Sequence, residues 1–203
     1  PMAEDKAEVY YSLGNLFRAK GDNSKASHYF KEAVKNRINH EDALFQLAMI
    51  TEEEGSFDEI LDFYQEFIDQ DPYSAGAWYN LGVVYNRPGR FEEAIKAYEY
   101  ALIIDDAFAS AHFNMGNSLM NTQDFKGALE AYQNTINCEG ANAENCCYMG
   151  AAYEKLGKID EAFTYFKKSA KLDEEYDDAW FGLGMCMLKK EKFFEAIHYF
   201  KKA

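Results

Sequence analysis

Small and apolar residues recur along the chain at the spacing of amphipathic helices. In one stretch they fall at i, i+3, i+4 and i+7 of a single helical face: Trp78, Leu81, Gly82 and Tyr85. A second apolar face follows at Ala94, Tyr98 and Ala101. Pro88 lies between the two stretches and ends the first helix, because proline donates no backbone hydrogen bond and disfavours helix in the residue before it. The pattern predicts two helices joined by a short turn.

This hairpin is repeated with a period of 34 residues. A small residue marks the first helix: Gly14, Ala48, Gly82, Gly116, Gly150 and Gly184. Two series mark the second helix, one small and one aromatic: Ala26, Ile60, Ala94, Ala128, Ala162 and Ala196, then Phe30, Tyr64, Tyr98, Tyr132, Phe166 and Phe200. Three series with one period predict six tandem repeats. Their bounds are 7–40, 41–74, 75–108, 109–142, 143–176 and an incomplete 177–203, after an N-terminal extension at 1–6.

Each repeat is divided near its middle by a turn residue. This residue is usually glycine, and twice it is not: Gly21, Gly55, Gly89, Gln123, Gly157 and Glu191. A single hairpin cannot bury its own apolar stripe, whereas stacked hairpins share one core. Small residues let the two helices approach closely, and we expect the aromatic series to fill the space to the next hairpin. The pattern therefore predicts an all-α array.

These motifs resemble the tetratricopeptide repeat (TPR) family over residues 7–203. The second repeat departs most from the family pattern, with Ala48, Thr51, Ile60 and Phe67 at positions that carry other residues elsewhere. The resemblance implies a right-handed superhelical solenoid of antiparallel helical hairpins. It also implies a scaffold that binds another protein and has no catalytic activity of its own.

The resemblance further implies that the first helix of each repeat lines a concave groove, in which a partner peptide or helix binds. Counting from the start of each repeat, the predicted groove residues at the fifth and ninth positions are Tyr11, Phe45, Tyr79, Phe113 and Phe181, and Asn15, Met49 and Asn117. Aromatic side chains there are anchors for a partner. The alternative, that they pack between adjacent first helices, stays open.

Asparagines form a second candidate feature. Asn80 and Asn114 hold the sixth position of successive repeats and resemble the asparagine ladder of O-linked N-acetylglucosamine transferase, although the ladder here is short. An amide side chain both donates to and accepts from a peptide backbone. The family's carboxylate clamp for chaperone tails is not expected, because the positions for its basic residues hold others, such as Tyr79, Asp178 and Gly182.

Charge is strongly negative and unevenly distributed. The net charge is −14, which argues against nucleic acid and membrane surfaces as partners. The second repeat has eleven acidic residues and no Lys or Arg, whereas the first has six basic and three acidic residues. We expect Asp42, Glu52 and Glu53 to face the groove. Two interpretations stay open: a solvated acidic face, or a site for a basic segment of the partner.

Candidate chemistry is sparse. The four cysteines and four histidines have no metal-ligand spacing, so we predict no cofactor and no metal, and reduced thiols. His112 takes the position of Trp78 and Trp180 and is predicted to be a packing residue. The start of the chain lacks the pattern of a secretory signal, which favours a cytoplasmic protein.

Two alternatives to a stand-alone scaffold remain. The chain stops at Ala203, inside its last predicted helix and without a polar capping helix. It is then either the TPR region of a larger enzyme, such as a glycosyltransferase, or a structural array that self-associates through the uncapped C-terminal repeat.

Overall fold

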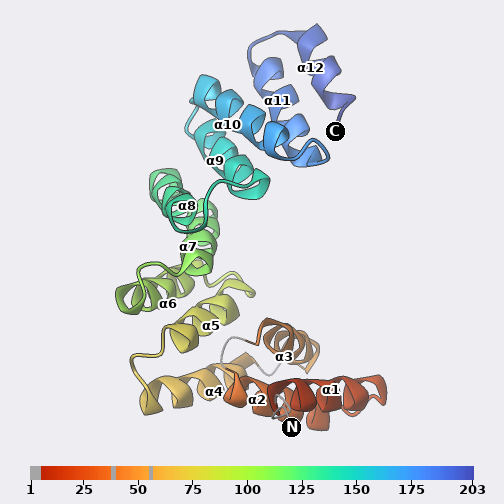
Figure 1. The fold of residues 1–203 in the computed structure, drawn as a ribbon, viewed down its shortest axis with the longest axis vertical. Helices are drawn as coiled ribbons and strands as arrows, with labels where there is room; N and C mark the ends of the chain where they lie inside the picture. Colours follow the sequence, from red (N-terminus) through yellow and green to blue (C-terminus); the bar gives the residue numbers. More distant parts are fainter. Residues whose placement is uncertain (1–5, 38–39, 55–56) are drawn as a thin grey trace, which may run out of the picture. The chain divides into compact units, whose positions relative to one another are not determined.

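A computed structural model describes residues 6–37, 40–54 and 57–203, except for the side chains of Glu41, Phe45, Ala48 and Glu52. Within these residues the chain forms twelve α-helices and no strand (Figure 1). The helices are α1 (Lys6–Ala19), α2 (Asn23–Asn36), α3 (Glu41–Glu54), α4 (Phe57–Gln70), α5 (Ala75–Asn86), α6 (Phe91–Ile104), α7 (Ala109–Asn121), α8 (Phe125–Glu139), α9 (Ala143–Lys155), α10 (Ile159–Leu172), α11 (Asp177–Lys189) and α12 (Phe193–Phe200). The prediction of an all-α fold of tandem hairpins is confirmed.

The helices form two compact units, Pro1–Ile104 and Asp105–Ala203. Each unit contains three hairpins in which an odd-numbered helix pairs with the even-numbered helix that follows. Each unit also has its own apolar core, supplied by both helices of its hairpins. No helix in the described part of the chain is long and apolar enough to cross a membrane.

The small residue of the first helix and the aromatic of the second are packing partners. Tyr98 and Tyr132 are fully buried, and a Cβ built on Gly82 or Gly116 would lie only 2.5 Å from the ring of its partner. Only glycine permits this approach, because a methyl group there would overpack the core. The aromatic ring therefore fills the space inside its own hairpin, not only the space to the next hairpin as predicted.

The turns explain the recurring glycine. Gly21, Gly89 and Gly157 have φ angles of 75°, 81° and 74°, in the left-handed region that glycine adopts without steric cost. Gln123 and Glu191 adopt the same conformation, with φ angles of 65° and 59°. For a residue with a Cβ this conformation costs roughly 1–2 kcal/mol. The fold thus imposes one turn geometry even where glycine is missing, and Gly55 lies outside the described residues.

The fourth position of a repeat joins the hairpin to the loop before it. The indole N–H groups of Trp78 and Trp180 donate to carbonyl oxygens six residues earlier, at 3.0 and 2.8 Å. In the fourth repeat, Nε2 of His112 lies 2.9 Å from the Asp106 carbonyl oxygen. Because a carbonyl oxygen only accepts, Nε2 carries the proton. His112 is buried, so its predicted role in packing is confirmed, and it also takes over the hydrogen bond of the tryptophan.

Candidate functional site

The predicted aromatic residues of the first helices lie against the second helix of their own hairpin. In four repeats the ring centroids of the two aromatics are 5.6 to 6.0 Å apart: Tyr11 with Phe30, Tyr79 with Tyr98, Phe113 with Tyr132, and Phe181 with Phe200. Their exposure differs widely, since Tyr79 is 9% exposed and Phe181 is 54% exposed. Only part of this aromatic series is therefore accessible to a partner, and the side chain of Phe45 lies outside the described residues.

The predicted polar residues also differ in their surroundings. Asn80 is 1% exposed, whereas Asn15 and Asn114 are half-buried. The Oδ1 atom of Asn117 accepts a hydrogen bond of 2.8 Å from the hydroxyl of Tyr132, so part of its bonding capacity is used within its own hairpin. The half-buried Met49 has its sulfur 4.0 Å from Nη1 of Arg87. An asparagine ladder that grips a peptide stays a prediction.

The acidic second repeat is in contact with the basic first repeat. Arg18 of α1 donates to the backbone oxygen and to the side-chain oxygen of Gln46, at 3.3 and 2.6 Å, and to Glu53 at 3.1 Å. Part of the charge difference between the two repeats is thus offset inside the chain. Asp42 is exposed, and the side chain of Glu52 lies outside the described residues.

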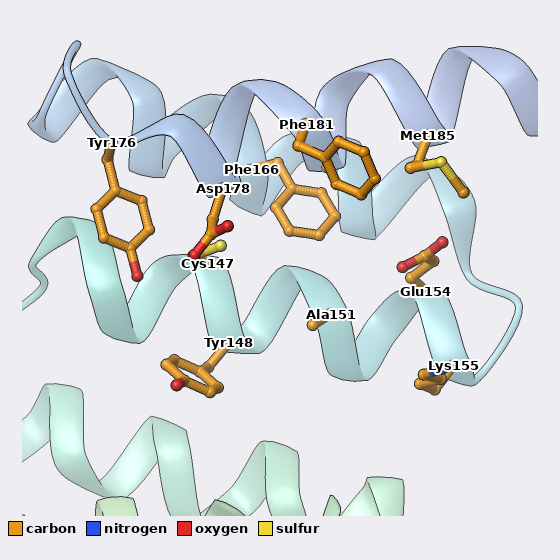
Figure 2. Close-up of a pocket in the computed structure, with 11 residues that line it drawn as sticks. Cys147, Tyr148, Ala151, Glu154, Lys155, Phe166, Tyr176, Asp178, Phe181 and Met185 are labelled. Carbon is orange, nitrogen blue, oxygen red and sulfur yellow. The ribbon is translucent and has the colours of Figure 1, made fainter. Parts of the chain in front are cut away.

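The surface of α9 and α11 contains a hollow of about 430 Å³ (Figure 2). Its volume falls within the ~300–1,000 Å³ of ligand pockets. Six of its lining residues hold the fifth, sixth and ninth positions of repeats five and six: Cys147, Tyr148 and Ala151, and Phe181, Gly182 and Met185. We call this hollow the α9–α11 pocket; its remaining lining residues are Glu154, Lys155, Phe166, Tyr176 and Asp178.

Two small residues keep the α9–α11 pocket open. Gly182 lies over the ring of Phe166, and a Cβ at this position would come within 2.5 Å of that ring. Ala151 holds the ninth position, where other repeats carry larger side chains such as Met49. The predicted binding residues included Phe181 but none of its neighbours in the pocket, although Cys147, Ala151 and Met185 hold the same fifth and ninth groove positions. The small residues at two groove positions were the signal that could have found them.

Burial and nearby acids set the chemistry of the pocket. Burial, with Asp178 and Glu144 adding to it, raises the pKa of Cys147 to about 12, and the same influences together with Cys147 raise the pKa of Tyr176 to about 12. The Cys147 thiol is therefore protonated at neutral pH and is a poor nucleophile or metal ligand. No group of residues in the described ranges could hold a metal ion. The arrangement is suited to binding a side chain.

The end of the α9–α11 pocket opposite Tyr176 carries charges of both signs. Glu154 of α9 forms an ion pair of 2.9 Å with Lys189 of α11, and Lys155 also lines this end. In Figure 2, Glu154 and Met185 lie at this end, Phe166 and Phe181 lie in the middle, and Asp178 lies near Tyr176 at the other end.

The repeats match a known family over more than half of the chain. Sequence profiles described as tetratricopeptide repeat match residues 11–75, 75–108 and 143–176. No curated protein matches the chain. Many solved structures do, and MamA is one, with a TM-score of 0.71 and 23% identity over 77% of this chain and 91% of that chain.

Two further structures extend this similarity. YrrB, described as a TPR protein with an unusual peptide-binding site, has a TM-score of 0.65 and 22% identity over 85% of this chain and 89% of its own. A tetratricopeptide repeat protein from Parabacteroides merdae has a TM-score of 0.71 and 18% identity over 97% of this chain and 78% of its own. Repeats of this kind form scaffolds for protein interactions. The chain belongs to the tetratricopeptide repeat family.

Proposed function

We propose that this chain is a non-catalytic scaffold that binds an extended or helical segment of a partner protein along the surface of its first helices. The observation that carries the proposal is the α9–α11 pocket. It is built from the fifth, sixth and ninth positions of two successive repeats, and the chain's own packing leaves Phe181 exposed and Ala151 and Met185 only half-buried. A hollow with an apolar middle and polar ends is the usual form of a site that anchors a partner side chain.

The predicted groove residues outside this pocket are further candidate contacts within each of the two units. Asn15, Met49 and Phe113 are only half-buried and so are available to a partner. The similarity to YrrB, whose description includes a peptide-binding site, agrees with a peptide as ligand. A basic partner segment near the acidic second repeat is part of the same proposal, because Asp42 and Glu54 remain exposed there.

Affinity capture with matched variants tests the scaffold function. One groove variant carries Asn15→Ala and Met49→Ala, and a second carries Phe181→Ala and Met185→Ala. The control carries Tyr73→Ala and Ile103→Ala, which remove two exposed apolar side chains, 82% and 77% accessible, at positions outside the predicted groove. We expect a protein that the parent chain and the control retain and that at least one groove variant loses. Identical retention by all four chains would contradict binding in the groove.

A second candidate function is self-association through α12, favoured by one position. Phe194 is 91% exposed, and it occupies a position that is polar and exposed in every earlier repeat whose residue is described: Ser24, Asp58, Glu92, Lys126 and Asp160. Phe193 and Ile197, 58% and 52% exposed, lie on the same short helix. Clustered apolar exposure of this kind marks an interaction surface.

Sedimentation velocity tests this second candidate. If α12 joins two copies, the mass of the parent chain rises with concentration, and Phe194→Ser, which installs the residue of the first repeat, returns it to that of a monomer. A monomer at all concentrations would exclude self-association.

A further inference from the structure

The middle of the α9–α11 pocket is apolar and partly uncovered. Phe166 of α10 is 3% exposed and lies beneath Gly182, whereas the ring of Phe181 is 54% exposed and stands beside it (Figure 2). Ala151 and Met185 complete this region. A bulky apolar side chain that entered here would remove the Phe181 ring from water, which is the main favourable contribution to association.

One end of the pocket is acidic. Glu144 and Asp178 both hold the second position of their repeats, and both are exposed. Asp178 lines this end, whereas Glu144 lies outside the lining, four residues before Tyr148 on α9. After the larger effect of burial, both carboxylates contribute to raising the pKa of Tyr148, Tyr176 and Cys147, so both act on groups at this end. Within the described part of the chain neither carboxylate forms an ion pair. A positive charge placed here would be attracted by both.

The two ends of the pocket are not equivalent. The carboxylate of Glu154 is already paired with Lys189, and Lys155 adds a further positive charge at that end. A bound cation is therefore favoured at the end formed by Asp178 and Tyr176, where the Tyr176 ring also offers a face to a guanidinium or ammonium group. An acidic segment would be repelled there.

We propose that the α9–α11 pocket selects a segment of a partner protein in which a bulky apolar residue lies next to a lysine or arginine. The apolar side chain occupies the space over Phe166 beside Phe181, and the cationic side chain lies against Asp178 and is attracted also by the nearby Glu144. This inference rests on the proposed function, since it assigns a ligand chemistry to one part of the scaffold surface. The apolar contact supplies affinity, and the charge supplies orientation and choice of sequence.

A phage-displayed library of random peptides, selected on the full chain, tests the proposal. We expect the selected peptides to share a bulky apolar residue adjacent to Lys or Arg. One selected peptide, labelled with fluorescein, then gives affinities by fluorescence anisotropy. Ala151→Met fills the pocket with the residue that the second repeat carries at the same position, and we expect it to weaken binding by at least about tenfold. Phe181→Ala serves as a second variant if Ala151→Met lowers the melting temperature.

A charge cycle isolates the acidic end. The double variant Glu144→Gln and Asp178→Asn should weaken binding about two- to fivefold, and it should have no effect on a peptide whose Lys or Arg is replaced by Gln. Asp178→Asn alone and its matched control Asp177→Asn separate the pocket from general charge, because Asp177 is the neighbouring acid of α11 and does not line the pocket. Asp178→Asn should weaken binding. Asp177→Asn should leave the affinity unchanged.

Several outcomes would overturn the proposal. These are peptides enriched in acidic residues, peptides without an apolar residue, an affinity unchanged by both pocket variants, or a library that yields no binder. A peptide whose affinity is unchanged by the pocket variants but lost with Asn15→Ala and Met49→Ala would overturn this inference alone. The proposed binding in the groove would then still hold.

Discussion

The third repeat and the α9–α11 pocket show how one repeat pattern produces a closed surface and an open one. In the third repeat the fifth and sixth positions carry Tyr79 and Asn80, which are 9% and 1% exposed. In the sixth repeat the same positions carry Phe181, which is 54% exposed, and Gly182. The same repeat positions are therefore closed in one repeat and open in another, and the side chains packed around them determine where a partner gains access.

The largest effect is expected from removing a buried ring rather than an exposed one. Tyr98→Ala should lower the free energy of unfolding by ~3–5 kcal/mol, because it leaves a cavity against Gly82. Phe181→Ala, which truncates a ring that is already half in water, should cost about 1 kcal/mol. Urea denaturation of both variants measures the difference. Equal losses would mean that the two aromatic positions are packed alike.

The pocket thiol should make stability depend on alkaline pH. The pKa of Cys147 is about 12 in the fold and 9.0 in the free thiol, so between these values the folded chain keeps a proton that the unfolded chain has lost. The contribution of this thiol to the free energy of unfolding is therefore fully present below pH 9. It falls as the pH rises above 9, by up to ~1.4 kcal/mol per pH unit.

Unfolding free energies of the parent chain and of Cys147→Ala, measured from pH 8 to pH 11, check this. The amount by which the unfolding free energy of the parent chain exceeds that of Cys147→Ala should decrease over that interval. The exposed Cys138 provides the control for loss of a thiol, since Cys138→Ala should leave the free energy of unfolding at pH 8 nearly unchanged. A constant difference between the parent chain and Cys147→Ala would contradict burial of the thiol.

Two buried tyrosines allow the contribution of the hydroxyl group to stability to be measured separately from that of the ring. The Tyr132 hydroxyl donates to Asn117 at 2.8 Å, whereas the Tyr98 hydroxyl is buried with no partner among the described residues. Tyr132→Phe should cost ~0.5–1.5 kcal/mol. Tyr98→Phe should be neutral or stabilising, because it removes a buried polar group that lacks a hydrogen bond. Thermal melts of the two variants measure this difference. A larger loss of stability for Tyr98→Phe than for Tyr132→Phe would show that the Tyr98 hydroxyl forms a hydrogen bond.

The smallest effect concerns the turns that lack glycine. Gln123→Gly should raise the unfolding free energy by ~0.5–1 kcal/mol. The substitution removes the strain of a left-handed residue, and part of this gain is offset because glycine makes the unfolded chain more flexible. Glu191→Gly should act alike. Gln133→Gly, inside α8, is the control and should destabilise by about 1 kcal/mol. Destabilisation by all three substitutions would contradict strain at the turns.

The fold was predictable from sequence because each repeated contact recurs at a fixed step. Gly82 and Tyr98 are one instance of a glycine–aromatic pairing that appears in five of the six repeats, with Ala48 in place of glycine in the second. The turn position was visible even at Gln123, where only the period identifies it. The His112 hydrogen bond to the preceding loop was not visible, because the period shows that histidine replaces tryptophan but not that the ring N–H of either residue contacts the loop.

The site was less predictable because exposure is not a property of a single position. Tyr79 and Phe181 are equivalent in the repeat, and only their neighbours make one buried and the other accessible. The α9–α11 pocket arises from what is missing at Ala151 and Gly182, together with charges contributed by two repeats. A sequence pattern reports the residues that are present, and an opening between side chains appears only once the helices are packed.

The proposed function requires that a partner segment bind in the α9–α11 pocket. Backbone amide chemical shifts of isotope-labelled chain, recorded with and without a selected peptide, test it most directly. We expect the largest changes at Ala151, Gly182 and their neighbours on α9 and α11, and we expect these changes to disappear in Ala151→Met. Changes confined to the second helices, or changes that persist in Ala151→Met, would contradict it.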